Sequence, residues 1–399
     1  MAGRAPAMSL AEQIGRTLAR RDRWRPLEIA FWLVALASIF LLPGKHLILT
    51  EIVILGLFAI SLDLILGYSG IISLGHAAYF GFGAYVAGLI AKYGLVTEPV
   101  LGLIVSAFAA AALGFVTSFL VLRGSDLTRL MVTLGVALVL REIANRLDWL
   151  TGGADGLQGV TMTPILGRFT FDIAGHVAYV YSLVVLFLLF LVIRRLVNSP
   201  FGLSLRSVRG NPVRAAAIGI SVNARLVAIY TAAAGIAGIA GALLTQTTQF
   251  ASLDVLSFER SADVLLVLTI GGTGYLYGGM IGAVVFKLLQ DYLAGVTPQY
   301  WQFWIGLGLV MMVLFGRVYG AIIAAIIFGL SSAMSLWLNF SFLHIIVFTV
   351  TVTLLLGIVR APLLKAFTSL EQRVVPLFQR MWSRSEVAAE RRADSAPRA

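Results

Sequence analysis

The chain has 399 residues, of which 59% are hydrophobic and 12% charged, and its formal net charge is +11. A soluble domain could not cover this much apolar surface, so the composition predicts an integral membrane protein. The chain contains no cysteine, which excludes disulfides, thiolate metal sites and a cysteine nucleophile. In a membrane protein, positive charge reports orientation and contact with lipid headgroups, and we infer no nucleic-acid function from it.

The first 26 residues are rich in arginine, and we expect residues 1–26 to form a cytoplasmic N-terminal segment. A cleaved signal peptide is the alternative for this end, but the many later apolar stretches favour an uncleaved anchor helix. A helix needs about 20 mostly apolar residues to cross the hydrocarbon core. Apolar stretches of suitable character lie at 27–43, 49–68, 71–91, 99–122, 129–150, 177–197, 224–245, 260–271, 276–292, 300–316, 318–338 and 342–358. The predicted fold is therefore an all-α integral membrane protein, a polytopic helical bundle of about ten to twelve membrane segments.

The distribution of lysine and arginine tests how many of these stretches cross the membrane. Six crossings place the arginines of 194–214 inside, and the outside gaps 151–176 and 246–259 together contain a single arginine. Keeping the C-terminal arginines inside as well requires 260–271 and 276–292 to be two segments of a hairpin broken by glycines. We therefore expect both termini in the cytoplasm, a transmembrane domain at 27–316, an additional hydrophobic hairpin at 317–358 and a basic polar tail at 359–399.

Small residues line one face of the third predicted span. Ala77, Gly81, Ala84 and Gly88 follow one another at spacings of four, three and four, and a similar run lies at 234–241 in the seventh span. Such faces are typical of closely packed membrane helices, and a ligand-binding role is the alternative.

The segment from Gly67 to His76 contains so many glycines and hydroxyl residues that it should interrupt a helix at membrane depth. Broken backbone is tolerated there only beside protein or a water-filled cavity. The candidate pathway residues belong to this break and to the later glycine turn: Ser69, Gly70, Ser73, Gly75, His76, Gly271 and Gly272. His76 either lines such a cavity or is a hydrogen-bonded packing residue, and the sequence leaves both open.

Three acidic residues of the apolar stretches raise a similar question: Asp63, Glu142 and Asp263. Arg141 and Arg260 are available as partners at adjacent or helical spacing. Paired structural charges and a proton relay both stay open, although no chain of relay residues stands out.

The basic segment 199–220 contains a short helix with both ends marked. Asn211 is a good N-cap, Pro212 suits the first helical position, and Gly219 supplies a left-handed C-terminal stop. A helix of about seven residues is not stable alone, so it must dock on its own protein or on a partner. It is either a coupling helix seated in a cytoplasmic ATPase or an interfacial helix whose arginines contact lipid headgroups.

Four blocks of sequence carry a resemblance to a known family: residues 62–90, 150–156, 199–243 and, more weakly, 262–282. Over about residues 45–316, the chain resembles the branched-chain amino acid ABC transporter permease family, specifically its M-type membrane subunit. The resemblance implies an ABC permease fold in a bacterial inner membrane, forming the translocation pathway for branched-chain or related amino acids. Family members usually end in a short basic tail, so the apolar stretches at 317–358 depart from the pattern.

The resemblance also implies partners. These are a second homologous permease subunit, two cytoplasmic ABC ATPase subunits and an extracytoplasmic solute-binding protein, assembled in the lipid bilayer. The ATPase would contact a coupling helix that comprises Asn211, Pro212, Arg214, Ala215, Ala216 and Gly219. The binding protein would contact the glycine-rich loop through Gly152, Gly153 and Asp155, and a simple solvent turn is the alternative there.

The chain itself is not expected to be an enzyme. It has no Gly-x-x-x-x-Gly-Lys-Ser/Thr phosphate loop, because Pro43-Gly44-Lys45-His46 lacks the first glycine and the hydroxyl residue. We expect no catalytic residue, cofactor or metal site. The rival classes are a single-subunit secondary transporter or channel for a small solute and a membrane scaffold. Amino acids, amides, urea-like solutes and small aromatic acids all stay open as the solute.

Overall fold

The structure is a computed structural model that describes residues 26–172, 174–296 and 298–315. The chain divides into one unit that runs to Leu289 and a second that begins at Gln290. In chain order the helices are α2 (Pro26–Leu41), α3 (His46–Leu66), α4 (Ala77–Lys92), α5 (Pro99–Val121), α6 (Asp126–Arg146), α7 (Asp148–Thr151), η1 (Gly153–Asp155), α8 (His176–Val197), α9 (Pro200–Gly210), α10 (Pro212–Ala217), α11 (Val222–Thr248), η2 (Leu253–Leu256), α12 (Phe258–Gly271), α13 (Leu276–Val296) and α14 (Trp301–Phe315).

The prediction of an all-helical fold is confirmed for these described residues, which contain only isolated β-bridges besides helices and loops. Within the described residues, five helices are long and apolar enough to cross a membrane: α3, α5, α8, α11 and α13. Shorter apolar helices lie within α2, α4 and α14. Nine of the first ten predicted apolar stretches overlap one helix each, and the stretch at 129–150 overlaps both α6 and α7. The stretches at 318–338 and 342–358 lie outside the described residues. The total of ten to twelve membrane segments stays a prediction.

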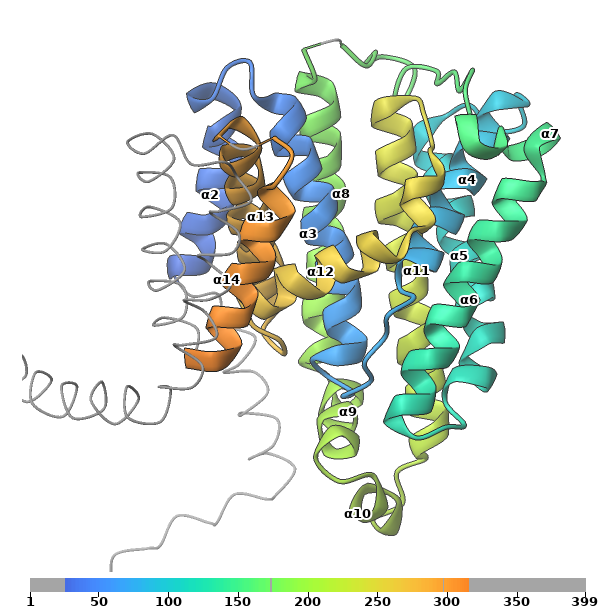
Figure 1. Ribbon diagram of the computed structural model, residues 1–399, viewed down its shortest axis with the longest axis vertical. Helices are drawn as coiled ribbons and strands as arrows, with labels where there is room; N and C mark the ends of the chain where they lie inside the picture. The colour runs from blue at the N-terminus through green and yellow to red at the C-terminus, as the bar shows by residue number, and fades with distance from the viewer. Residues whose placement is uncertain (1–25, 173, 297, 316–399) are drawn as a thin grey trace, which may run out of the picture. The chain divides into compact units, whose positions relative to one another are not determined.

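The core of the first unit is built from α3, α4, α5 and α11, which pack side by side (Figure 1). Small residues allow these helices to approach closely. A Cβ added to Gly83 would fall on the backbone of Gly238, and a Cβ added to Gly241 would fall on the carbonyl of Phe80. On the predicted small-residue faces, Gly241 lies against the backbone of Phe80, whereas Gly81 and Gly88 lie against the side chains of Leu256 and Leu157. The chain's own atoms fill the space at these glycines, which favours the close-packing interpretation.

The predicted break between the second and third spans is present. α3 ends at Leu66 and α4 begins only at Ala77. The third span therefore begins six residues later than the predicted start at residue 71. Gly70 has φ +79°, a conformation that glycine adopts without strain. The Ser261 hydroxyl of α12 accepts a hydrogen bond from the first helical amide of α4, Ala77, at 3.0 Å. The break thus brings α12 to the N-terminus of α4.

The predicted glycine-broken hairpin is also present, as α12 and α13. α12 ends at Gly271, and the turn that follows contains Gly272 at φ +100° and Gly274 at φ +77°. A Cβ on Gly278 would fall on the carbonyl of Gly272, so the first turn of α13 lies directly against the end of α12. Glycine is required here for both the backbone angles and the close approach.

Candidate functional site

The short helix α10 has the predicted structure. The Asn211 side chain accepts a hydrogen bond from the amide of Arg214 at 2.9 Å, and Pro212 is the first helical residue. Gly219 has φ +88°, and the amide of Ile220 donates to the carbonyl of Ala215 at 3.1 Å. This is a Schellman ending, in which a left-handed residue closes the last turn.

The sequence reasoning missed the helix α9, which precedes α10 directly. Its signal was available, since Ser199 stands at the N-cap position and Pro200 at the first helical position. The segment from α9 to α10 leaves the end of α8 and lies at the opposite end of the bundle from the loop between α7 and α8 (Figure 1). We call the end with α9 and α10 the arginine-rich end.

The helix α10 packs against its own chain through one buried side chain, that of Ala215. Ala215 is 2% exposed and packs with Ile71, Val208 and Leu226. Of the residues expected to contact an ATPase, Ala215 therefore faces inward and is covered by its own chain. The outward surface instead contains Val213 and Ile218, which are 77% and 74% exposed, together with exposed Arg214, Ala216 and Ala217. We call this surface the α10 tip.

The ends of α3, α9 and α12 meet at a junction close to the α10 tip. The Arg209 guanidinium, in the last turn of α9, donates to the carbonyl of Gly67 just after α3. The buried carboxylate of Asp63 accepts a hydrogen bond from the amide of Gly274 at 2.7 Å. A Cβ on Gly274 would lie 3.2 Å from the Arg209 guanidinium, so only glycine fits without displacement. The junction therefore connects α9 to α3 and to the α12–α13 hairpin.

Asp63 and Glu142 have partners other than those considered from the sequence. Asp63 bonds to a backbone amide, as described above. Glu142 pairs with Arg146, one helical turn further along α6, at 2.6 Å, and both side chains are mostly exposed. The suggestion of Arg141 as the partner of Glu142 is therefore corrected.

The candidate pathway residues do not form one cluster. Ser69 and Gly70 lie beside the junction, where a Cβ on Gly70 would come within 3.2 Å of the Arg209 side chain. Gly75 lies against the backbone of Thr133 in α6, and Gly271 and Gly272 form the end of the α12 hairpin. A pathway role for these residues, including Ser73, stays a prediction.

His76 is 1% exposed and is held between α3 and α4. Its Nε2 forms a hydrogen bond of 2.9 Å with the Ser61 hydroxyl, and its ring stacks on Phe58 with centroids 5.5 Å apart. Of the two interpretations of His76, this geometry favours packing, because the ring faces side chains of its own chain.

A buried polar cluster that the sequence reasoning missed lies at the centre of the core. The Tyr79 hydroxyl of α4 is 2.9 Å from the Tyr230 hydroxyl of α11 and 2.7 Å from the Thr117 hydroxyl of α5. Tyrosines within apolar spans were the available signal, because a buried phenol needs a hydrogen-bond partner. The cluster joins three core helices.

The glycine-rich loop at the other end of the bundle is partly buried. Gly152 and Gly153 have φ +80° and +53°, and Gly153 is buried, whereas Asp155 is exposed. Leu157 pairs with Ala251 through a β-bridge and holds the loop against the segment that follows α11. Of the three residues expected to contact a binding protein, Asp155 has an exposed side chain, and Gly152 and Gly153 set the shape of the turn.

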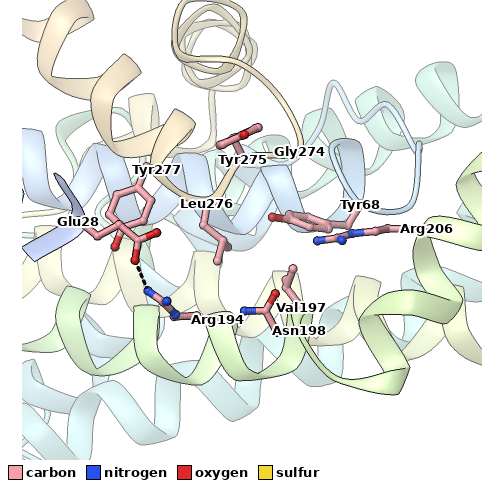
Figure 2. A pocket seen from close by; sticks show the side chains of 10 residues that line it. All are labelled: Glu28, Tyr68, Arg194, Val197, Asn198, Arg206, Gly274, Tyr275, Leu276 and Tyr277. Carbon is pink, nitrogen blue, oxygen red and sulfur yellow. Dashed lines mark hydrogen bonds and ion pairs between the residues drawn. The ribbon is translucent and has the colours of Figure 1, made fainter. Parts of the chain in front are cut away.

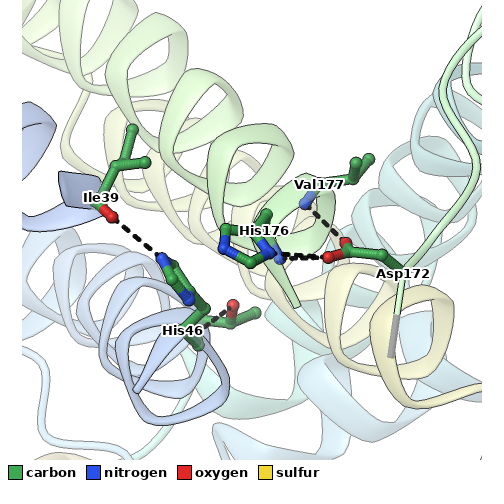
Figure 3. A network of polar contacts seen from close by, with 6 residues as sticks. Ile39, His46, Asp172, His176 and Val177 are labelled. Atoms are coloured by element: carbon green, nitrogen blue, oxygen red, sulfur yellow. Dashed lines mark hydrogen bonds and ion pairs between the residues drawn. The ribbon is translucent and has the colours of Figure 1, made fainter. Parts of the chain in front are cut away.

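A histidine pair joins the starts of α3 and α8 at this same end (Figure 3). The rings of His46 and His176 have centroids 4.0 Å apart, and His46 Nε2 donates to the carbonyl of Ile39 at 3.1 Å. The Asp172 carboxylate accepts from His176 Nδ1 at 2.8 Å and from the amide of Val177 at 2.9 Å. Burial alone would raise the pKa of Asp172, but the hydrogen bonds from Val177 and His176 outweigh it and hold the pKa at about 2. Asp172 therefore caps α8 in its ionised form.

An Asp172→Ala variant should expose the first amides of α8 to solvent. Loss of a cap costs about 1 kcal/mol, which corresponds to roughly fivefold faster hydrogen exchange at His176 and Val177. The depressed pKa means that the cap stabilises the folded chain above about pH 4 and is lost as the pH falls through about 2. Protection corrected for intrinsic rates should therefore be equal at pH 7 and pH 5 in the wild type. Equal exchange in the variant and the wild type would contradict this role.

In the part of the chain that the structure describes, no three histidine or acidic side chains are grouped as a metal site would require. The arrangement instead offers an exposed apolar surface at the α10 tip, the junction of α3, α9 and α12, and a packed helical core.

Comparison with known proteins gives consistent matches. The family model "Branched-chain amino acid transport system / permease component" matches residues 46–314. The high-affinity branched-chain amino acid transport system permease protein LivM of Escherichia coli is 26% identical over 318 residues, 73% of each chain. The corresponding permease protein BraD of Pseudomonas aeruginosa is 25% identical over 292 residues, 66% of this chain and 90% of the relative. No solved structure matches significantly.

Proposed function

Because the chain belongs to the branched-chain amino acid transport permease family, we propose that it is the membrane-spanning permease subunit of an ABC importer. It forms the translocation pathway for branched-chain or related amino acids in the inner membrane of a bacterium, with both termini in the cytoplasm. Its partners are a second homologous permease subunit, two ATPase subunits that hydrolyse ATP, and an extracytoplasmic solute-binding protein.

The observation that carries this proposal is the exposed apolar α10 tip. α10 has six residues, too few for a stable isolated helix, yet it is capped at both ends and fastened through Ala215. Val213 and Ile218 nevertheless point away from the chain, and a rigid exposed apolar surface is typical of a docking site. Arginines surround it, which favours the cytoplasmic side. A coupling helix that docks on an ATPase accounts for these features together.

The junction near the α10 tip connects α10 to the membrane helices, so a movement of α10 can be transmitted to them. A force on α10 acts on α9, and Arg209 transmits it through hydrogen bonding to the end of α3. The amide of Gly274 connects the same end of α3 to the α12–α13 hairpin. Packed elements with such discrete contacts move together. ATP-driven movement at the tip therefore reaches the membrane-embedded break and hairpin, where the candidate pathway residues lie.

Reconstitution tests the proposed class of transporter. The chain is incorporated into liposomes alone or with the second permease, ATPases and binding protein encoded beside it. We expect uptake of labelled leucine only by the complete complex and only with ATP on the ATPase side. ATP-independent uptake by the chain alone would support the single-subunit secondary transporter or channel instead.

A further inference from the structure

A polar cavity lies at the arginine-rich end of the first unit, apart from the α10 tip. Its volume is about 370 Å³, within the range of small-ligand pockets. Its walls come from α2, α8, α9, the second residue after α3, the turn before α13 and the start of α13 (Figure 2). The coupling route proposed above uses the amide of Gly274 at the edge of this cavity but neither of its arginines.

The charges in the cavity leave one arginine without a carboxylate. On one side, Arg194 pairs with Glu28 at 2.7 Å, and their side chains are only 7% and 19% exposed. On the other side, the Arg206 guanidinium lies 5.4 Å from the centroid of the Tyr68 ring. Of the described residues that line the cavity, Glu28 is the only acid. Within the described lining, Glu28 pairs with Arg194 and Arg206 adds a second positive charge, so these residues together have a net positive charge.

Neutral hydrogen-bonding groups surround Arg206. The hydroxyls of Tyr68 and Tyr275 and the amide of Asn198 belong to the same lining, and the Tyr275 side chain is 71% exposed. Figure 2 shows Asn198 between the two arginines and Tyr275 on the far side of the cavity from Asn198. A guanidinium with hydroxyl and amide groups is suited to the oxygens of a phosphate group.

The depth of the cavity matches that of lipid headgroups. Glu28 is in the first turn of α2, Arg194 in the last turn of α8, and Tyr277 in the first turn of α13. α8 and α13 are long and apolar enough to span the membrane, so their ends at the cavity mark the boundary between hydrocarbon and water. Tyrosines are enriched at this boundary, and basic pockets between helices there bind anionic headgroups.

From this geometry we infer that the cavity binds a phosphate group, with Arg206 as its principal charged contact and the anionic headgroup of a phospholipid as the source best matched to its depth. Bound there, the phosphate bridges α9 to the ends of α8 and α13. The lipid therefore holds in place the segment that carries the α10 tip. This inference does not depend on the ATPase-coupling role.

Lipid binding to the full chain tests the site. The chain is purified in detergent, incubated with phosphatidylglycerol, and lipid adducts are counted by native mass spectrometry. Arg206→Gln should lower retention about tenfold, because a charge-assisted contact is lost. The matched control is Arg195→Gln, which removes an exposed arginine of α8 that does not line the cavity and should retain lipid like the wild type. Tyr275→Phe removes one exposed hydroxyl without threatening the fold and should lower retention severalfold.

Three further outcomes are informative. Retention of phosphatidylglycerol that inorganic phosphate does not displace supports the lipid as the source. Binding of inorganic phosphate that depends on Arg206 and persists in phosphatidylcholine alone supports the same phosphate site with a soluble ligand. Equal retention by the wild type, Arg206→Gln and Tyr275→Phe, with no Arg206-dependent binding of inorganic phosphate, would overturn the inference.

Discussion

A Gly219→Val variant should insert in the membrane normally but lose most of its transport activity. Gly219 has φ +88°, and a Cβ added there meets no atom within 4 Å, so the effect comes from the backbone alone. A β-branched residue in this conformation costs about 1–2 kcal/mol. That free energy lowers the ratio of intact to disrupted α10 about 5–30-fold. Because a helix of six residues is marginally stable, uptake and solute-stimulated ATPase activity of the reconstituted complex should fall together, about threefold or more.

The matched control is Gly210→Ala at the end of α9. Gly210 does not have positive φ, and its added Cβ also meets no atom within 4 Å. Its activities should stay within about twofold of the wild type. Gly202→Ala, which lies in the same segment, is a poor control because its Cβ would collide with the carbonyl of Val197. Wild-type uptake and ATPase stimulation in Gly219→Val would contradict the assignment of α10 as the coupling helix.

An Arg209→Met variant should separate docking from coupling. The α10 tip stays intact, so the ATPase should still copurify with the complex. The hydrogen bond from the guanidinium to Gly67 is lost, however, and such a bond to a charged group contributes about 1.5–3 kcal/mol. Solute-stimulated ATPase activity should fall about tenfold, while basal ATP hydrolysis persists.

The corresponding control is Arg195→Met, which removes an exposed arginine of α8 outside the junction. It should keep wild-type stimulation. If Arg209→Met responds to solute as the wild type does, Arg209 does not transmit the movement of the tip.

Local sequence patterns were sufficient to locate the apolar helices and the ends of α10, although they missed α9. Apolar stretches predict helices because a segment surrounded by lipid must form its backbone hydrogen bonds within itself, as an α-helix does. Asn211, Pro212 and Gly219 each act on the backbone within a few residues, so their structural roles follow from sequence spacing. The glycines of the α12–α13 turn are local signals of the same kind.

Contacts between distant segments could not be predicted in this way. Ala215 turns inward because Ile71 and Leu226 lie next to it in space, at separations far beyond a helical turn. The bond between Arg209 and Gly67 joins residues 142 positions apart. Nothing in the residues around Asp63 shows that the amide of Gly274 reaches its carboxylate. The junction and the cavity therefore emerge only from the folded chain.

Crosslinking from the α10 tip tests the central claim most directly. The chain has no cysteine, so Ile218→Cys introduces a unique thiol at a side chain that is 74% exposed. A short photoreactive label on this thiol, in the complex with the subunits encoded beside it, should crosslink to the subunit that carries the phosphate loop. The same label on Asp155→Cys, at the opposite end of the bundle, should not reach that subunit. Crosslinking of Ile218→Cys to lipid alone would contradict the account and identify α10 as an interfacial helix.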